Sequence, residues 1–399
     1  MNTQKQCALN RVQQLYPQLA ELCMKIHDNP ELGFQETFAS NLLTSFLEEE
    51  QFAVERNCAK LPTAFRAERS SGKGGPTIGF LCEYDALPEI GHGCGHNIIA
   101  TAAVGAAAAA ASVVNQLGGS VVVLGTPSEE GAGGGKQLMW DAGSFQGVDC
   151  AMMFHPGSQT VVRDKTLAIQ SMRFVYHGIA AHAGAAQEQG RNALEAAIQT
   201  FNGINSLRGH LSRDVNIHGI ITKGGTAPNI IPDLAESLFA VRAKTAAALR
   251  AVVERVCDCA RGAAMMTGCT VEIVPVGVPY LDILPNETLL AQVEKNLEEL
   301  QIPIDVRQAP DALASTDVGN LSHHIPAIQC MIGVGSPALP HSQSFADACA
   351  GEAGAKIAIQ AAMALTATAV DLMENPQLVQ QAKLEQAQKE HNSQAEKEV

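Results

Sequence analysis

The sequence predicts an α/β protein: a mainly parallel-sheet domain with helices on both faces, plus an inserted smaller α+β domain. Three observations support this prediction. Strand-like and helix-like segments alternate between residues 77 and 154, the order changes to β-α-β-β-α-β from about residue 170, and helices and short strands return after residue 286. Alternating strands and helices are typical of βαβ units, whose strands are parallel.

Two helices and two short strands are expected before this alternating region. Apolar residues recur at helical spacing over residues 8–28, and a turn rich in helix breakers separates them from a second amphipathic segment at 36–50. Residues 52–56 and 62–68 have the length and composition of short strands.

The alternating region combines apolar strand candidates with an alanine-rich helix. That helix contains a long uncharged run, which is shorter and less hydrophobic than a membrane span should be. We therefore expect it to be buried within the protein. The expected elements are strands Thr77–Cys82, Ser120–Gly125 and Cys150–Phe154, and helices Ile98–Gln116 and Gly135–Asp141.

The change of pattern predicts the domain boundaries. Residues 170–277 are expected to form the inserted domain, and residues 1–169 and 278–382 the two parts of the first domain. Residues 383–399 are rich in Gln, Glu and Lys and predict a frayed helix or a flexible tail. The inserted domain should contain strands Ser171–His177, Val215–Thr222, Ala235–Val241 and Thr270–Val274, and helices Asn192–Leu207 and Ala246–Met266.

Composition restricts the partners. The formal net charge of −14 should repel nucleic acid and anionic membranes, so neither is expected to bind. The 11 cysteines have no regular spacing, which favours a reducing compartment over a disulfide framework. No signal peptide is visible at the start of the sequence, and we expect a cytoplasmic protein.

Metal-ligand residue types follow several predicted strands. Cys94 and His96 lie between the strand Thr77–Cys82 and the alanine-rich helix, and glycines flank the cysteine. Since the carboxyl ends of parallel strands meet at one edge of a sheet, these side chains should converge. The other candidates after strand ends are Glu129 and Glu130, His155, and His341, which follows an apolar strand predicted at Ala327–Ile332.

Simpler interpretations exist for parts of this pattern. A Cys-x-His pair arises by chance, and Glu129-Glu130 could be an acidic pair that stabilises a helix N-terminus. The glycine-rich segment Gly131–Lys136 suggests a phosphate-binding loop, but Glu130 replaces the first required glycine and Gln137 replaces the Ser or Thr that would bind magnesium. The convergence of candidates favours a metal site instead.

The ligand types predict two metals. One thiolate, three imidazoles and one carboxylate are too many for one tetrahedral zinc that keeps an open position, but they suit two metals that share a ligand. Glu129 is then left over as a base. The candidate ligands are Cys94, His96, Glu130, His155 and His341.

The chain resembles the dinuclear metallohydrolases that include aminoacylase, glutamate carboxypeptidase, auxin-conjugate amidohydrolases and p-aminobenzoyl-glutamate hydrolases. The sequence around Glu83–Asn97 looks most similar to the branch of aminobenzoyl-glutamate hydrolase and a β-alanyl-lysine-type dipeptidase. The matching segments occur in family order over nearly the whole chain: His27–Glu36, Asp85–Pro88, Cys94–Asn97, Glu129–Gly131, His155-Pro156, His182–Gly184, Pro228–Pro232 and His341–Phe345.

The resemblance implies roles for the ligands. Cys94 would bridge the metals, Glu130 and His341 would complete one site, and His96 and His155 the other. Glu129 would be the general base and then the acid. We expect Asp85 to orient a ligand, whereas Glu83 departs from the aspartate usual in the auxin-conjugate branch and has no assigned role.

The resemblance also implies substrate contacts and assembly. His182 would reach the scissile carbonyl oxygen from the inserted lid domain, and Asn229 and Arg242 would hold the substrate carboxylate. His182 could instead simply begin a helix, and Asn229 could be a turn residue between two prolines. The family pairs two subunits through the lid domain, so a homodimer is expected, with His182 serving the partner's site.

The predicted function is hydrolysis of an N-acyl amino acid or dipeptide amide bond by metal-activated water. Two divalent ions are expected, with zinc favoured by the cysteine ligand and manganese as the alternative. Three other interpretations remain: a catalytically silent binding or regulatory protein of the same fold, a structural zinc module, and a Cys–His hydrolase that uses Cys94 as nucleophile. A structural site would have clustered ligands, unlike this set.

Overall fold

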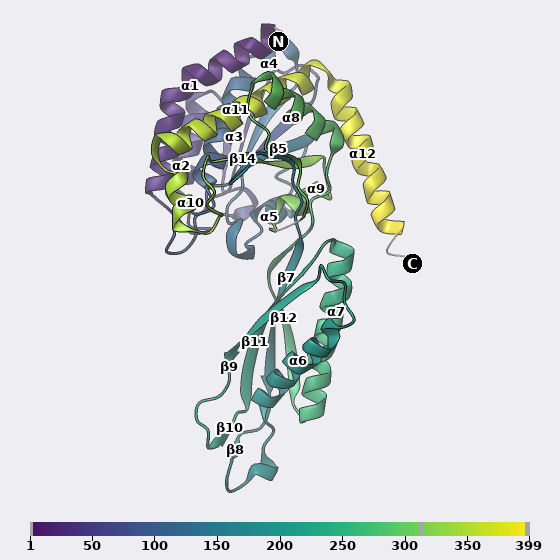
Figure 1. Cartoon of the computed structure of the whole chain (residues 1–399). Coiled ribbons are helices and arrows are strands. Elements are labelled where there is room, and N and C mark those ends of the chain that lie inside the picture. Colours follow the sequence, from purple (N-terminus) through teal and green to yellow (C-terminus); the bar gives the residue numbers. More distant parts are fainter. Residues whose placement is uncertain (1–2, 312–313, 396–399) are drawn as a thin grey trace. The chain divides into compact units, whose positions relative to one another are not determined.

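The computed structural model describes residues 3–311 and 314–395, which divide into two compact units (Figure 1). Among these residues, unit 2 comprises Thr166–Asp282 with residues 314–315, and unit 1 comprises the rest. The insertion predicted at 170–277 is a few residues shorter than unit 2, because its first and last strands are longer than their apolar patterns indicated.

Unit 1 contains an eight-stranded sheet in the order β1-β2-β4-β3-β5-β14-β6-β13. Strand β3 is parallel to β4 and β5, β5 is parallel to β14, and β6 is parallel to β13; β1, β2 and β4 pair antiparallel. The predicted α/β fold is confirmed. The strands are β1 (Ala53–Arg56), β2 (Phe65–Ser70), β3 (Thr77–Cys82), β4 (Ser120–Gly125), β5 (Cys150–Gly157), β6 (Val161–Arg163), β13 (Val306–Gln308) and β14 (Ala327–Gly333).

Helices cover both faces of this sheet because successive strand residues point to opposite sides. Phe80 lies opposite Val123 in the β3–β4 pair, and both pack with α1, α3 and α11; Leu81 and Leu124 pack on the other face with α5 and α9. The helices of unit 1 are α1 (Thr3–Asp28), α2 (Thr37–Glu49), α3 (His96–Ala111), α4 (Val114–Leu117), α5 (Gly135–Asp141), α8 (Glu287–Glu299), α9 (Val318–Ser322), α10 (Gln343–Ala348), α11 (Gly351–Glu374) and α12 (Pro376–Ala395), with short 3₁₀ turns η1 (Cys58–Lys60) and η2 (Glu130–Ala132).

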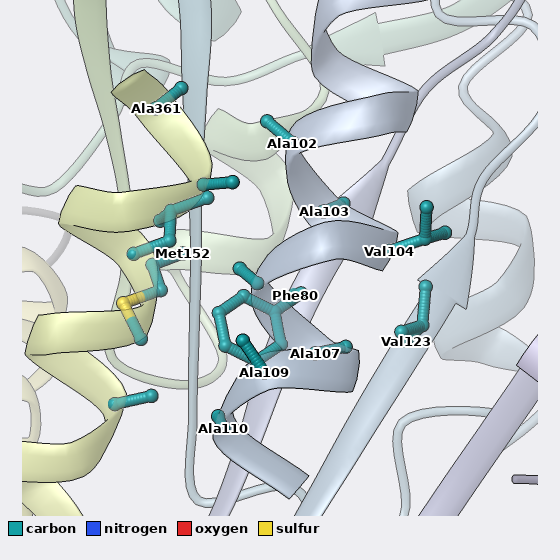
Figure 2. Packing of buried hydrophobic residues seen from close by; sticks show 14 of the residues in the cluster. Phe80, Ala102, Ala103, Val104, Ala107, Ala109, Ala110, Val123, Met152 and Ala361 are labelled. Carbon is teal, nitrogen blue, oxygen red and sulfur yellow. The ribbon is translucent and has the colours of Figure 1, made fainter. Parts of the chain in front are cut away.

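The alanine-rich helix α3 is buried along its whole length, as the sequence predicts. Figure 2 shows its small side chains beside Phe80, Met152 and Ala361 of α11. A Cβ atom at Gly105 would lie 2.8 Å from a Leu19 methyl group of α1, so small residues let these helices approach closely. Among the described residues, only α11 is long and apolar enough to span a membrane, and 72% of its most apolar window is buried in the protein.

Helix α12 contains the described part of the predicted tail. Residues 383–395 continue the helix, in line with the helical alternative, whereas residues 396–399 lie outside the described residues. Glu385 accepts hydrogen bonds from the backbone N–H groups of Glu287 and Thr288, so α12 caps the start of α8. Composition alone did not predict this contact.

Unit 2 is an antiparallel sheet in the order β12-β7-β11-β9, packed against two helices. The β-α-β-β-α-β order matches the prediction, with one additional two-stranded pair, β8 with β10. Asn192 caps the start of helix α6, and its side chain accepts hydrogen bonds from Leu194 and Glu195 N–H. The elements are β7 (Ala168–His177), β8 (Ala181–His182), η3 (Gln187–Gln189), α6 (Ala193–Arg208), β9 (Asn216–Lys223), β10 (Ile230–Ile231), β11 (Leu234–Ala243), α7 (Ala246–Thr267) and β12 (Thr270–Tyr280).

Candidate metal centre

The loop between β3 and α3 places Cys94 and His96. Gly95 separates them with a φ of 75°, and a Cβ atom there would lie 2.5 Å from Pro156 Cγ, so this position requires glycine. His96 is the first residue of α3, and Cys94 lies in the turn before it. The tight turn therefore directs both side chains to the same edge of the sheet.

Three other segments complete this edge. Glu129 and Glu130 follow β4, and His341 follows β14 in a left-handed conformation with a φ of 66°. The His341 backbone N–H donates to Gly93 O at 2.8 Å, which ties its loop to the cysteine loop. His155 was expected just beyond its strand; it lies within β5, because β5 continues to Gly157 by pairing with β14.

The five predicted ligands come together in two groups that share Cys94. One group is Cys94, His96 and His155, and the other is Cys94, Glu130 and His341; within each, the ligand-type atoms all lie within 4.8 Å of one another. A third group joins His96, Glu130 and Glu129. Two groups that share one residue are the arrangement that the sequence predicts for two metals with a shared ligand. The role of each candidate ligand stays a prediction.

The site fits a divalent cation. Among the described residues, His96 Nε2 and Glu130 Oε1 are buried atoms without a hydrogen-bond partner. Burial raises the pKa of Glu129 well above its usual range, and the nearby carboxylates of Glu83 and Glu130 raise it further. Bound cations would satisfy the open atoms and offset this crowding of negative charge. Thiolate, imidazole and carboxylate together suit a transition metal such as zinc.

Asp85 contacts two of the candidate ligand residues. Its carboxylate lies 3.0 Å from His96 Nδ1 and accepts a hydrogen bond from the Glu130 backbone N–H at 2.9 Å. Burial opposes ionisation of Asp85, but the adjacent His96 and this N–H outweigh burial and lower its pKa. Asp85 occupies Nδ1 of His96, and Nε2 lies 3.9 Å from Glu130 Oε1. That Asp85 orients a metal ligand stays a prediction.

Comparison with known proteins identifies the family. A model of peptidase family M20/M25/M40 matches residues 80–364, which include all five candidate ligands. The chain belongs to this peptidase family. It is a metal-dependent hydrolase, as the sequence predicted, and the silent alternative gains no support. An Xaa-Arg dipeptidase from Mus musculus is 36% identical over 94% of this chain and 90% of its own length.

Two further known proteins are similar over most of the chain. A p-aminobenzoyl-glutamate hydrolase polypeptide of Escherichia coli is 35% identical over 80% of this chain and 71% of its own. A dinuclear metal-binding M20 peptidase from Bacillus subtilis has the same fold, with a TM-score of 0.69 and 22% identity over 91% of this chain and 99% of its own.

In this M20 family hydrolase, a buried ion network that the sequence pattern did not predict lies beside the candidate ligands. Lys136 Nζ lies 2.5 Å from Glu83 Oε1 and also pairs with Asp317, and all three side chains are fully buried. Glu83 Oε2 in turn lies 3.6 Å from His96 Nε2. Removing one partner of such a pair typically costs about 3–5 kcal/mol, because a buried charge is left uncompensated.

This network also explains why the glycine-rich segment is not a phosphate site. The Lys136 ammonium, which a phosphate loop would present to its ligand, is fully buried between two carboxylates. Burial opposes its protonation, but Asp317 and Glu83 outweigh burial and raise its pKa. The sequence assigned no role to Glu83. In the structure its carboxylate pairs with Lys136.

The three predicted substrate contacts lie in unit 2. His182 is an exposed residue of β8. The backbone N–H of the next residue, Ala183, donates to Asn229 O at 3.0 Å, so the segments that contain His182 and Asn229 lie side by side. Residues around them line a pocket of about 430 Å³. Arg242 is partly buried on β11 and donates to Ser315 Oγ at 2.8 Å. Their roles toward substrate stay predictions.

Proposed function

We propose that this M20 family enzyme is a two-metal hydrolase that cleaves the amide bond of dipeptides or N-acyl amino acids. The observation that carries the proposal is the position of Cys94 in two ligand groups, with Glu129 beside them. The activities for which the relatives are named, Xaa-Arg dipeptidase and p-aminobenzoyl-glutamate hydrolase, support the substrate class. The cysteine ligand favours zinc over manganese.

Each residue then has a distinct task. Two ions would be held by the five candidate ligands, Cys94, His96, Glu130, His155 and His341. When bound, such ions polarise the scissile carbonyl and lower the pKa of water. Glu129 accepts the proton of the attacking water on its carboxylate and delivers it to the amide nitrogen. His182 donates a hydrogen bond to the developing oxyanion. Asn229 and Arg242 hold the substrate carboxylate.

Metal removal and a substrate screen test this function. We expect two ions per chain by metal analysis, and hydrolysis of at least one substrate among N-acyl amino acids, aminobenzoyl-glutamate, β-alanyl dipeptides and dipeptides that end in arginine. A chelator should abolish turnover, and added zinc should restore it. Turnover that survives complete metal removal would favour the Cys94 nucleophile, and a metal-loaded protein that hydrolyses none of these substrates would favour the silent alternative.

We also propose a cytoplasmic homodimer formed through the inserted domain, in which His182 serves the partner's active site. The resemblance of the segment around His182 supports the pairing, and the 11 cysteines, all of which are free in the structure, suit a reducing compartment.

Co-expression of two inactive variants tests this shared site. Glu129→Gln and His182→Ala should each be inactive, and random pairing makes about half of the dimers mixed, each with one intact site of two. Activity should therefore return to about a quarter of wild type when both are co-expressed. If each His182 acts within its own chain, every site keeps one defect and no activity returns.

A further inference from the structure

A buried carboxylate outside the ligand set contacts the loop that carries Glu129. Glu36 precedes α2 and has an exposed fraction of 0%. One of its oxygens accepts a hydrogen bond from the Ser128 backbone N–H at 2.9 Å, and the other accepts one from the Thr63 hydroxyl at 2.7 Å. A carboxylate in such a position needs a reason, because burying it is costly.

Ser128 needs external support for its conformation. Its φ of 56° lies in the left-handed region, which is unfavourable for a residue with a side chain. The segment before Glu36 also packs closely against it: a Cβ atom at Gly33 would lie 2.3 Å from Ser128 Oγ. The turn that contains Gly33 and Glu36 therefore holds Ser128 by packing on one side and by a hydrogen bond to its N–H.

Glu129 lies between two such anchors. Glu36 binds the N–H of the residue before it, and Asp85 binds the N–H of the residue after it, Glu130. The two anchors differ in their other contacts. Asp85 also contacts His96, whereas the Glu36 side chain accepts its hydrogen bonds from Thr63 and Ser128, which are not candidate ligands.

We propose that Glu36 is a positioning residue for Glu129: by holding Ser128 N–H, it sets the direction of the Glu129 carboxylate without contacting the metal ligands. The inference rests on the proposed function, in which Glu129 transfers the proton. A displacement of about 1 Å at a reacting group can cost on the order of 10²-fold in rate. Loss of Glu36 should therefore affect turnover more than substrate binding or metal content.

The test compares three variants in the zinc-loaded enzyme. Glu36→Ala should lower kcat by about 10- to 100-fold while KM and the metal content stay unchanged. Glu36→Gln should keep most of the turnover, because the Gln amide oxygen can accept the hydrogen bond from Ser128 N–H. Burial raises the pKa of Glu36 to about 7, so the uncharged carboxylic acid, which Gln resembles, is readily formed in the wild-type protein. Gly33→Ala should reproduce the loss of kcat by pushing on Ser128, which keeps the test valid if Glu36→Ala fails to fold.

Two control variants separate positioning from loss of stability. Gln35→Ala changes an exposed neighbour in the same turn and should have no effect. Asp371→Asn disrupts a buried ion pair with Lys5 between α1 and α11, and should lower Tm with kcat unchanged. The inference is wrong if Glu36→Gln is as damaging as Glu36→Ala, if KM or metal content changes instead of kcat, or if all Glu36 and Gly33 variants are fully active. A wild-type enzyme that hydrolyses nothing would instead contradict the proposed function.

Discussion

Glu129→Gln is expected to lower kcat by about 10²–10⁴-fold, the range for loss of a general acid–base residue. The side-chain amide of the variant cannot take the proton of the attacking water, so the nucleophile stays weak. The nitrogen of the scissile amide bond in the substrate would also have to leave without a proton. Glu129 belongs to neither of the two ligand groups that share Cys94. Two ions per chain should therefore remain in the variant. Steady-state kinetics together with metal analysis of the purified variant measure both effects.

Glu130→Gln is the matched control for this prediction. Glu130 Oε1 lies 3.4 Å from His341 Nε2, and the residue belongs to the ligand group that contains Cys94. Its replacement should weaken metal binding, and activity should recover in part when zinc is supplied in excess. If Glu129→Gln loses the metal while Glu130→Gln keeps it, the roles of the two glutamates are the reverse of those proposed.

Cys94→Ala is expected to weaken the binding of both metals and to abolish turnover at ordinary zinc concentrations. The thiol is the one side chain common to the two ligand groups, so its loss would take one candidate ligand from each proposed ion site. The loss of affinity should exceed the roughly 10- to 100-fold that removal of a ligand-orienting partner costs. Because metal binding contributes to folding stability, the difference in Tm between metal-loaded and metal-free protein should also shrink.

Two further variants make the bridging role specific. Cys82→Ala removes another buried thiol, at the end of β3, which belongs to none of the ligand groups. This variant should keep its metals. Cys94→Asp should recover part of the binding, because a carboxylate can bridge the same pair of ions. Retention of two tightly bound ions in Cys94→Ala would refute the bridge.

Local sequence patterns predicted many of the elements that carry the site. The bounds of β3, β4 and α5 match the predictions residue for residue. For the two strands the reason is that the apolar run ends at Gly125 or just before Glu83. The candidate ligands chosen at strand ends do converge, since parallel strands bring their carboxyl ends to one edge of the sheet. The family motifs in the sequence were sufficient to predict the enzyme class.

Tertiary structure decided the contacts that surround the candidate ligands. Lys136 and Asp317 are 181 residues apart in sequence, and Glu36 and Ser128 are 92 apart; neither pair has a local signal. Periodicity reports which face of an element is apolar, whereas a buried charge is paired with whichever opposite charge the fold places beside it. For this reason the convergence of the candidate ligands was predictable from strand ends and motifs. The buried carboxylates that contact the Glu129 loop and Lys136 emerged only from the packing of distant segments.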